Sequence, residues 1–171
     1  MASRGYGRII LTGSASVFGQ PGGHAYSTVK MAMVGLGRTL HADAQAQGID
    51  IKTNVVAPMA YTGPSHEANR ERFLDLMEPD NVAAAVGWLA SPNCDVSGAW
   101  IRAGGTYVGR IHLLMTHGWA TGMHPLTPEE VIDHLDAIND LQDASFPQSA
   151  NDVTDQMFRV ADEARRARDA G

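Results

Sequence analysis

Three short segments of the chain have the hydrophobic pattern of β-strands. Residues 8–13 form a nearly continuous apolar run that ends at a glycine, which is typical of a strand buried on both faces of a sheet. Residues 48–58 alternate apolar and polar positions between a glycine and a proline. Residues 98–105 form a third, shorter candidate bounded by glycines. We therefore expect a strand at each of these places.

Two helical patterns separate the predicted strands. The first covers about residues 25–43, where apolar side chains recur at steps of three and four residues: Ala25, Val29, Met33, Leu36 and Leu40. Residues 80–91 form the second predicted helix, between the second and third strands. An alternation of strands and helices is the signature of an α/β fold with a parallel sheet and right-handed crossovers.

The helix at residues 25–43 carries a second stripe, made of small side chains. This stripe consists of Thr28, Ala32, Gly35 and Thr39. An apolar face beside a small-residue face indicates a helix covered from two directions, by its own sheet and by another helix. Two interpretations stay open at this point: a well-buried core helix, or a helix in a subunit interface.

The pattern changes after Gly105. Thr127, Pro128 and Glu130 stand at the N-cap, first and third positions of a predicted helix, and Thr127 and Glu130 form a capping box. Residues 151–168 form another polar helix. We expect these helices to form a C-terminal appendage packed on the sheet.

Composition and charge narrow the classes of function. The chain has 171 residues, of which 44% are hydrophobic and 19% charged, as in soluble globular proteins. The net charge of −6 gives no support for nucleic-acid binding, which usually shows a basic patch. No apolar stretch approaches the roughly 20 residues that span a bilayer, and the first residues lack the apolar core of a signal peptide. We therefore expect a cytoplasmic protein that binds neither nucleic acid nor membrane.

The cysteine and histidine residues give no sign of metal or thiol chemistry. Cys94, the single cysteine, cannot form an internal disulfide, and it lies in a turn-rich stretch without a nearby histidine base. The spacings of His112, His117 and His124 fit no familiar metal pattern. We expect a free thiol and no metal site.

Tyr26 and Lys30 carry the most specific chemical pattern. They are four residues apart in the predicted helix, so both side chains lie on one face, one turn apart. An ammonium group beside a tyrosine favours the phenolate, and the pair could then move a proton to or from a carbonyl or alcohol oxygen. Ser14 and Ser16 follow the first strand, at the end where open α/β sheets place their ligands, and either hydroxyl could hold that oxygen. The alternative is that Tyr26 merely packs and Lys30 is merely solvated.

Four segments follow one another in a recognisable order: GRIILTGSAS, YSTVK, IKTNVVAP and SGAWIRAGG. They resemble the second, catalytic half of a short-chain dehydrogenase/reductase, and the resemblance covers nearly the whole chain. The tail, GGTYVGRIHLL followed by HPLTPEEVIDHLDAINDLQDASFPQS, resembles the (3R)-hydroxyacyl-CoA dehydrogenase unit of type 2 multifunctional enzymes. The resemblance implies a partial Rossmann-like, doubly wound parallel sheet at residues 1–108 and a helical extension at residues 109–171 packed on it.

The resemblance also implies roles for individual residues. Tyr26 would be the proton donor or acceptor, Lys30 would assist it and hold the nicotinamide ribose, and Ser14 would orient the substrate oxygen. The backbone of Pro58, Met59 and Thr62 would face the nicotinamide end of NAD or NADP. The family usually has one more residue between serine and tyrosine, so Ser16 remains a rival to Ser14. It commonly has glycine where this chain has Met59.

The dinucleotide-binding features of the family are missing from the sequence. No G-x-G-x-x-G pattern occurs in it, and the upstream catalytic asparagine is also missing. We therefore expect a truncated enzyme whose first strand leaves an apolar edge exposed. Such a chain would be only marginally stable, or it would be stabilised by self-association. We expect a homo-oligomer formed through the helices at residues 25–43 and 80–91.

Two classes of function follow. The first is an oxidoreductase acting on a small-molecule secondary alcohol or ketone, for which the resemblance implies a 3-hydroxyacyl-CoA. The second is a non-catalytic remnant that acts as an oligomerisation or interaction module. Residues 59–79 would cover the substrate, with an apolar pocket lined by Tyr61, Phe73, Leu74 and Met77, although an ordinary amphipathic helix explains these side chains nearly as well.

Overall fold

The computed structural model describes residues 1–62 and 77–170. It divides the chain into two compact units, Met1–Ile111 and His112–Gly171, and each unit is described by itself. The sequence placed the boundary after residue 108, but the strand over Tyr107–Ile111 crosses that position, so the first unit extends to Ile111.

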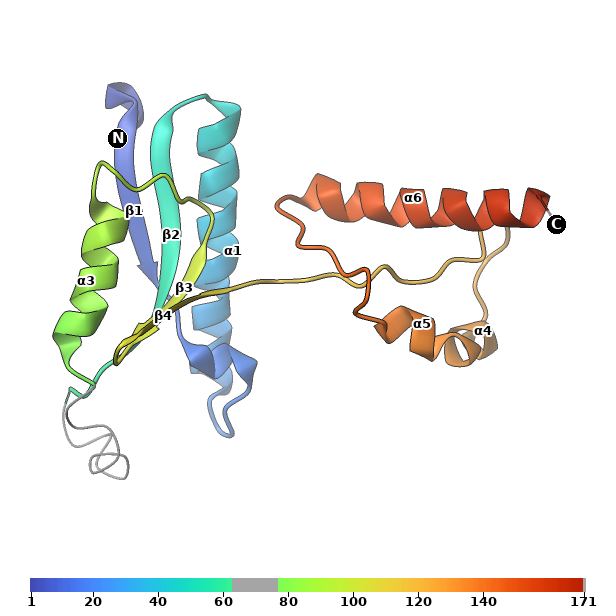
Figure 1. The fold of residues 1–171 in the computed structure, drawn as a ribbon, viewed down its shortest axis with the longest axis horizontal. Helices are drawn as coiled ribbons and strands as arrows, with labels where there is room; N and C mark the ends of the chain where they lie inside the picture. Colours follow the sequence, from blue (N-terminus) through green and yellow to red (C-terminus); the bar gives the residue numbers. More distant parts are fainter. Residues whose placement is uncertain (63–76, 171) are drawn as a thin grey trace. The chain divides into compact units, whose positions relative to one another are not determined.

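The first unit is built on a four-stranded sheet in the order β1-β2-β3-β4 (Figure 1). Its strands are β1 (Tyr6–Thr12), β2 (Asp50–Met59), β3 (Trp100–Gly104) and β4 (Tyr107–Ile111). The first three are parallel, as the alternating pattern predicts, and β4 runs antiparallel to β3. The sequence analysis missed β4, which follows β3 after a tight turn in which Gly105 has a φ of 59°.

Two helices cover opposite faces of this sheet (Figure 1). They are α1 (His24–Ala46) and α3 (Pro79–Ala90), and both confirm the predicted helices. The core between α3 and the sheet includes Val56, Leu89, Cys94 and Ile101, so Cys94 is a buried free thiol. The core on the α1 side consists of Val34, Val55, Ala57 and Trp100.

The predicted apolar stripe of α1 packs on the sheet only in part: Met33 contacts the core on this side of the sheet, whereas other members of the stripe point outward. Val29 and Leu36 are 56% and 45% exposed, whereas Val34 and Gly37 are buried. A Cβ atom at Gly37 would lie 2.9 Å from Cγ2 of Val55. The helix therefore approaches the sheet through its glycine, and this rotates Val29 and Leu36 outward.

The same rotation leaves the small-residue stripe of α1 uncovered. Thr28, Ala32, Gly35 and Thr39 are exposed. Within the described residues of the first unit, no second helix covers this stripe. The subunit-interface interpretation stays a prediction.

Strand β1 lies at the end of the sheet, and helices cover both of its faces as predicted, with Ile10 against the α3-side core and Leu11 against the α1-side core, but the burial is only partial. Ile9, Ile10 and Leu11 are half-buried. The reason is that β1 pairs only with β2, and no described strand lies on its other side. One edge of β1 therefore has unpaired backbone groups, as expected above.

Short helices complete the first unit. The 3₁₀-helix η1 (Ala2–Arg4) precedes β1, and η2 (Ala15–Phe18) connects β1 to α1. Ser14 is the N-cap of η2 and its side chain accepts a hydrogen bond from the backbone nitrogen of Ser16. The turn therefore folds back directly after the strand.

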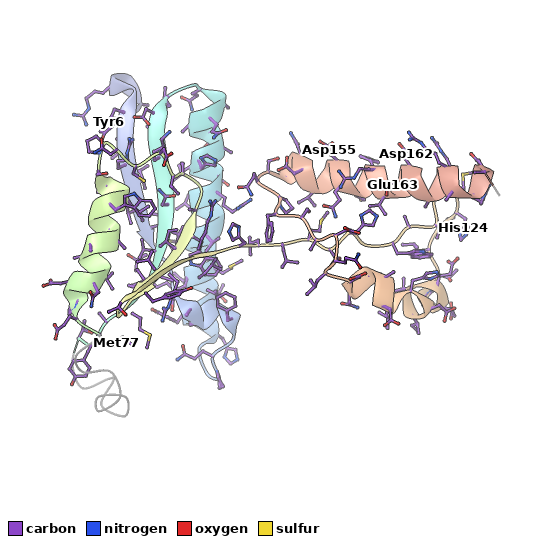
Figure 2. The ribbon with its side chains drawn as sticks, in the orientation of Figure 1. Tyr6, Met77, His124, Asp155, Asp162 and Glu163 are labelled. Atoms are coloured by element: carbon purple, nitrogen blue, oxygen red, sulfur yellow. The ribbon has the colours of Figure 1, made fainter. Side chains whose placement is uncertain are left out.

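The second unit contains α4 (Pro128–Asp133), α5 (Leu135–Asn139) and α6 (Ala150–Asp169). The predicted capping box of Thr127 and Glu130 is present, and Ser149 and Asp152 form a second one at α6. The acidic side chains of Asp155 and Asp162 project from one side of α6 (Figure 2). Among the described helices, none is long and apolar enough to cross a membrane.

Candidate functional site

Helix α1 places Tyr26 and Lys30 together. The Nζ atom of Lys30 lies 5.5 Å from the ring centroid of Tyr26. The same nitrogen donates a 2.9 Å hydrogen bond to the carbonyl oxygen of Thr12, the last residue of β1. The pair predicted from the four-residue spacing therefore lies at the carboxyl end of the sheet, where α1 begins.

Ser14 and Ser16 differ in accessibility. Ser14 is half-buried, and its Oγ atom accepts a 3.1 Å hydrogen bond from the backbone nitrogen of Ser16, which leaves its own hydroxyl hydrogen for another acceptor. Ser16 is 9% exposed and its Oγ atom has no hydrogen-bond partner in the part of the chain that the structure describes. The Oγ atom of Ser27 donates to the Ser16 carbonyl at 3.0 Å, which fastens η2 to α1.

The segment expected to face the cofactor lies at the same edge of the sheet. Thr12 is opposite Val56 in the pairing of β1 with β2, and the backbone nitrogen of Gly13 donates to the Val56 carbonyl at 2.7 Å. Ser14 lies two residues after Thr12, and Pro58 lies two residues after Val56. The carboxyl ends of β1 and β2 therefore bring the predicted catalytic and cofactor-facing residues to one place.

The accessible surfaces of these residues fit contact with a small molecule. Tyr26 is 54% exposed, and Pro58 and Thr62 are exposed at the end of β2. The ammonium group of Lys30 donates one of its three N–H groups to the Thr12 carbonyl, so two N–H donors remain for a ligand. The residues present thus fit the nicotinamide end of a dinucleotide.

Only part of the predicted substrate cover can be placed. The backbone nitrogen of Tyr61 donates a 2.8 Å hydrogen bond to the carbonyl oxygen of Met77, which is half-buried (Figure 2). Phe73 and Leu74 lie outside the described residues. The pocket predicted from these four side chains stays a prediction.

Sequence reasoning missed the close packing beneath the site. A Cβ atom at Gly13 would lie 2.8 Å from Cγ1 of Val55 and 3.3 Å from Nε1 of Trp100. The ring of Phe18 stacks on Trp100 with centroids 5.6 Å apart. The glycine after β1 therefore lets the turn that carries Ser14 lie against the core. The glycine is visible in the sequence, but its neighbours come from other strands.

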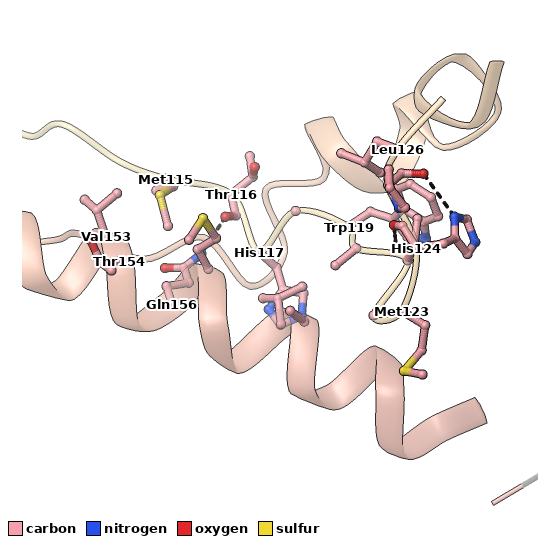
Figure 3. Close-up of a pocket in the computed structure, with 18 residues that line it drawn as sticks. Met115, Thr116, His117, Trp119, Met123, His124, Leu126, Val153, Thr154 and Gln156 are labelled. Carbon is pink, nitrogen blue, oxygen red and sulfur yellow. Dashed lines mark hydrogen bonds between the residues drawn. The ribbon is translucent and has the colours of Figure 1, made fainter. Parts of the chain in front are cut away.

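The second unit has a hollow of its own, also missed by the sequence analysis. It is open, measures about 690 Å³ and is lined by apolar side chains that include Met115, Met123, Leu126 and Met157 (Figure 3). Gln156, 4% exposed, reaches from α6 and donates a 2.6 Å hydrogen bond to the carbonyl of Thr116. The hollow lies between α6 and residues 115–126.

Two histidines line the hollow, and each faces a glutamate. Nε2 of His117 lies 3.3 Å from Glu163, and Nε2 of His124 lies 3.5 Å from Glu130. Hydrogen bonds from Thr127 hold the pKa of Glu130 below its ordinary value. No group of three metal-ligating side chains occurs among the described residues.

Comparisons with known proteins relate this chain to dehydrogenases of the short-chain type. The short chain dehydrogenase family model matches residues 1–72. Peroxisomal multifunctional enzyme type 2 of Mus musculus is 31% identical over 163 residues, covering 94% of this chain and 22% of the mouse protein. Peroxisomal multifunctional enzyme A of Dictyostelium discoideum is 30% identical over 153 residues, covering 89% and 34%. The chain thus spans about a fifth to a third of these relatives.

Solved structures show the same fold. The full-length peroxisomal multifunctional enzyme type 2 of Drosophila melanogaster superposes with a TM-score of 0.76 at 23% identity, covering 95% of this chain and 30% of that one. A short chain dehydrogenase from Mycobacterium avium gives a TM-score of 0.52 at 25% identity, covering 77% and 42%. The fold is α/β and Rossmann-like, and the chain is homologous to dehydrogenases of the short-chain type. It is also homologous to peroxisomal multifunctional and hydratase-dehydrogenase enzymes.

Proposed function

We propose that this chain is the catalytic half of an NAD(P)-dependent oxidoreductase of the short-chain type, which interconverts a secondary alcohol and a ketone. The observation that carries the proposal is the hydrogen bond from Lys30 to the Thr12 carbonyl, which fixes an ammonium group beside the Tyr26 ring at the carboxyl end of the sheet. The proposed substrate class is a 3-hydroxyacyl-CoA, which is supported by the likeness to the multifunctional enzymes.

The proposed roles follow from what each side chain can donate or accept. Tyr26 gives its phenolic proton to the ketone oxygen in reduction and takes it back from the alcohol in oxidation. Lys30 stabilises the phenolate by its charge and offers its remaining N–H donors to the nicotinamide ribose. The hydroxyl of Ser14 donates to the substrate oxygen and holds it near Tyr26. Ser14 is preferred to Ser16 because it is the more accessible of the two.

The cofactor supplies the hydride chemistry when it is bound. Tyr26, Lys30 and the backbone of Pro58, Met59 and Thr62 are the residues proposed to hold its nicotinamide end. A glycine-rich turn for the pyrophosphate is missing from this sequence. We propose that residues outside the given sequence supply the half of the fold that carries this turn in the family. The residues present leave the choice between NAD and NADP open.

A second function is favoured by the exposed apolar side chains of α1 and α3. Val29, Leu36 and Trp88 are 56%, 45% and 42% exposed. Such surface favours association, so a remnant that only joins copies of itself or a partner is the alternative. Homo-oligomerisation through residues 25–43 and 80–91 is proposed under either function, and light scattering tests it, since a stable monomer would contradict it.

The proposed location is the cytoplasm, whereas the mouse and Dictyostelium relatives are named as peroxisomal enzymes. Fractionation of cells that express the chain separates the two compartments. A chain found with peroxisomal markers would contradict the cytoplasmic proposal.

A fluorescence titration with NADH and NADPH tests the proposed enzyme. Saturable binding by the 171-residue chain, weakened by Lys30→Ala, is the expected result. Lys52→Ala is the matched control, because Lys52 is the other lysine of the chain and lies 3.3 Å from Asp50 at the amino end of β2. Failure of both nucleotides to bind would show that this chain alone is not a working dehydrogenase.

A further inference from the structure

We propose that Arg102 is a positioning residue for the end of β2 that leads into the cofactor-facing segment, residues 58–62. This role rests on the proposed function, because it supposes that a nicotinamide contacts that segment.

The last residues of β2 have few backbone partners. The pairing of β1 with β2 ends at Thr12 opposite Val56, and the chain after Gly13 turns away into η2. Beyond Val56, β2 is therefore paired with β3 alone. Pro58 also lacks an N–H group and can donate nothing to a neighbouring strand.

The guanidinium group of Arg102 supplies hydrogen bonds to β2 beyond the point where the pairing with β1 ends. Arg102 lies on β3 opposite Ala57. Its Nη1 atom donates to the carbonyl oxygens of Ala57 and Pro58, at 3.3 Å each. A guanidinium is planar, permanently charged and rich in donors, so one side chain can serve two consecutive carbonyls, which a lysine ammonium does less well.

Arg102 also contacts the side chain that replaces the glycine of the family pattern. Its Nη2 atom lies 2.7 Å from the sulfur of Met59, so the thioether is drawn toward β3. The backbones come close here as well, because a Cβ atom at Gly104 would clash with the carbonyl oxygen of Met59. Arg102 and Gly104 together accommodate Met59 at the point where β2 leaves the sheet.

This arrangement makes Arg102 a determinant of the segment's position without contact to the substrate. Loss of its donors should loosen residues 59–62 while α1, with Tyr26 and Lys30, stays in place. A bound nicotinamide would then meet a less ordered backbone, and its affinity should fall.

Hydrogen exchange measured by mass spectrometry on the 171-residue chain tests this role. Arg102→Met keeps most of the side-chain length and removes every donor. It should raise the exchange rate of the amides of residues 59–62 about tenfold or more, because it removes the charged donor of both carbonyl hydrogen bonds. Exchange in α1 should not change, and Arg102→Lys should recover part of the protection. Arg110→Met, an exposed arginine on β4, is the control.

A parallel NADH titration separates this inference from the proposed function. Weaker NADH binding by Arg102→Met, together with faster exchange at residues 59–62, supports the positioning role. If the unchanged chain binds NADH, and Arg102→Met alters neither exchange nor affinity, the role is wrong. If the unchanged chain binds no nucleotide, the proposed cofactor function fails, and the exchange data alone decide whether Arg102 holds the end of β2.

Discussion

The Nζ atom of Lys30 donates a 2.9 Å hydrogen bond to the carbonyl oxygen of Thr12. This bond joins the first turns of α1 to the end of β1, which are 18 residues apart in the sequence. It also fixes the direction of the ammonium group relative to the Tyr26 ring. The site therefore depends on the packing of α1 against the sheet, and the first prediction tests that packing.

Two glycines of α1 should respond oppositely to the same change. Gly37→Ala places a methyl group 2.9 Å from the buried side chain of Val55, so we expect it to lower the free energy of unfolding by about 1 to 3 kcal/mol. Gly35→Ala meets nothing within 4 Å on the exposed face, so we expect it to raise that free energy by up to about 1 kcal/mol. Urea unfolding of both variants measures the difference. Equal effects would show that α1 packs through another face.

The side chain of Asn54 should contribute strongly to stability. It is 1% exposed, donates to the Val96 carbonyl at 2.9 Å and accepts from the Ala99 nitrogen at 3.0 Å. Asn54→Ala leaves two backbone groups without partners, and we expect a loss of about 2 to 4 kcal/mol in unfolding free energy. Asn139→Ala is the control, since its single hydrogen bond is exposed. A loss below about 1 kcal/mol for Asn54→Ala would mean that water replaces both bonds.

His41 should make stability depend on pH. Burial lowers the pKa of His41 from its ordinary 6.5, and the charges of Arg38, Lys52 and Arg110 lower it further. Its Nδ1 atom lies 2.8 Å from the hydroxyl of Ser97. The unfolded chain therefore binds a proton more readily than the folded chain, and stability present above pH 6.5 falls as the pH drops toward the folded pKa.

A variant isolates the contribution of His41 to this pH dependence. Unfolding free energy measured from about pH 8 to 5 should decline less steeply in His41→Gln than in the unchanged chain. Identical slopes would assign the dependence to other groups.

Local patterns in the sequence predicted the three parallel strands, α1, α3 and the central pair. The capping box of Thr127 and Glu130 and the spacing of Tyr26 and Lys30 involve residues within one helical turn, so neighbours in sequence are neighbours in space. The predicted strands are likewise runs whose periodicity is set by the backbone. These features could be predicted because no distant residue decides them.

Features that depend on distant residues could not be predicted in this way. The face of α1 that packs closest to the sheet is set by Gly37 fitting against Val55, and hydrophobicity alone favoured a neighbouring stripe of which Val29 and Leu36 are exposed. The bonds from Arg102 to the end of β2 join residues 44 and 45 positions apart. An isolated arginine in a strand pattern gives no sign of such a partner.

The central claim is that Tyr26 transfers the proton in an alcohol–ketone reaction. Its most direct measurement is the turnover of a 3-hydroxyacyl-CoA by the chain supplied with an upstream dinucleotide-binding half, followed by nucleotide absorbance, with Tyr26→Phe beside it. We expect a loss of about 100-fold or more in kcat for Tyr26→Phe. Equal turnover by both proteins would contradict the claim.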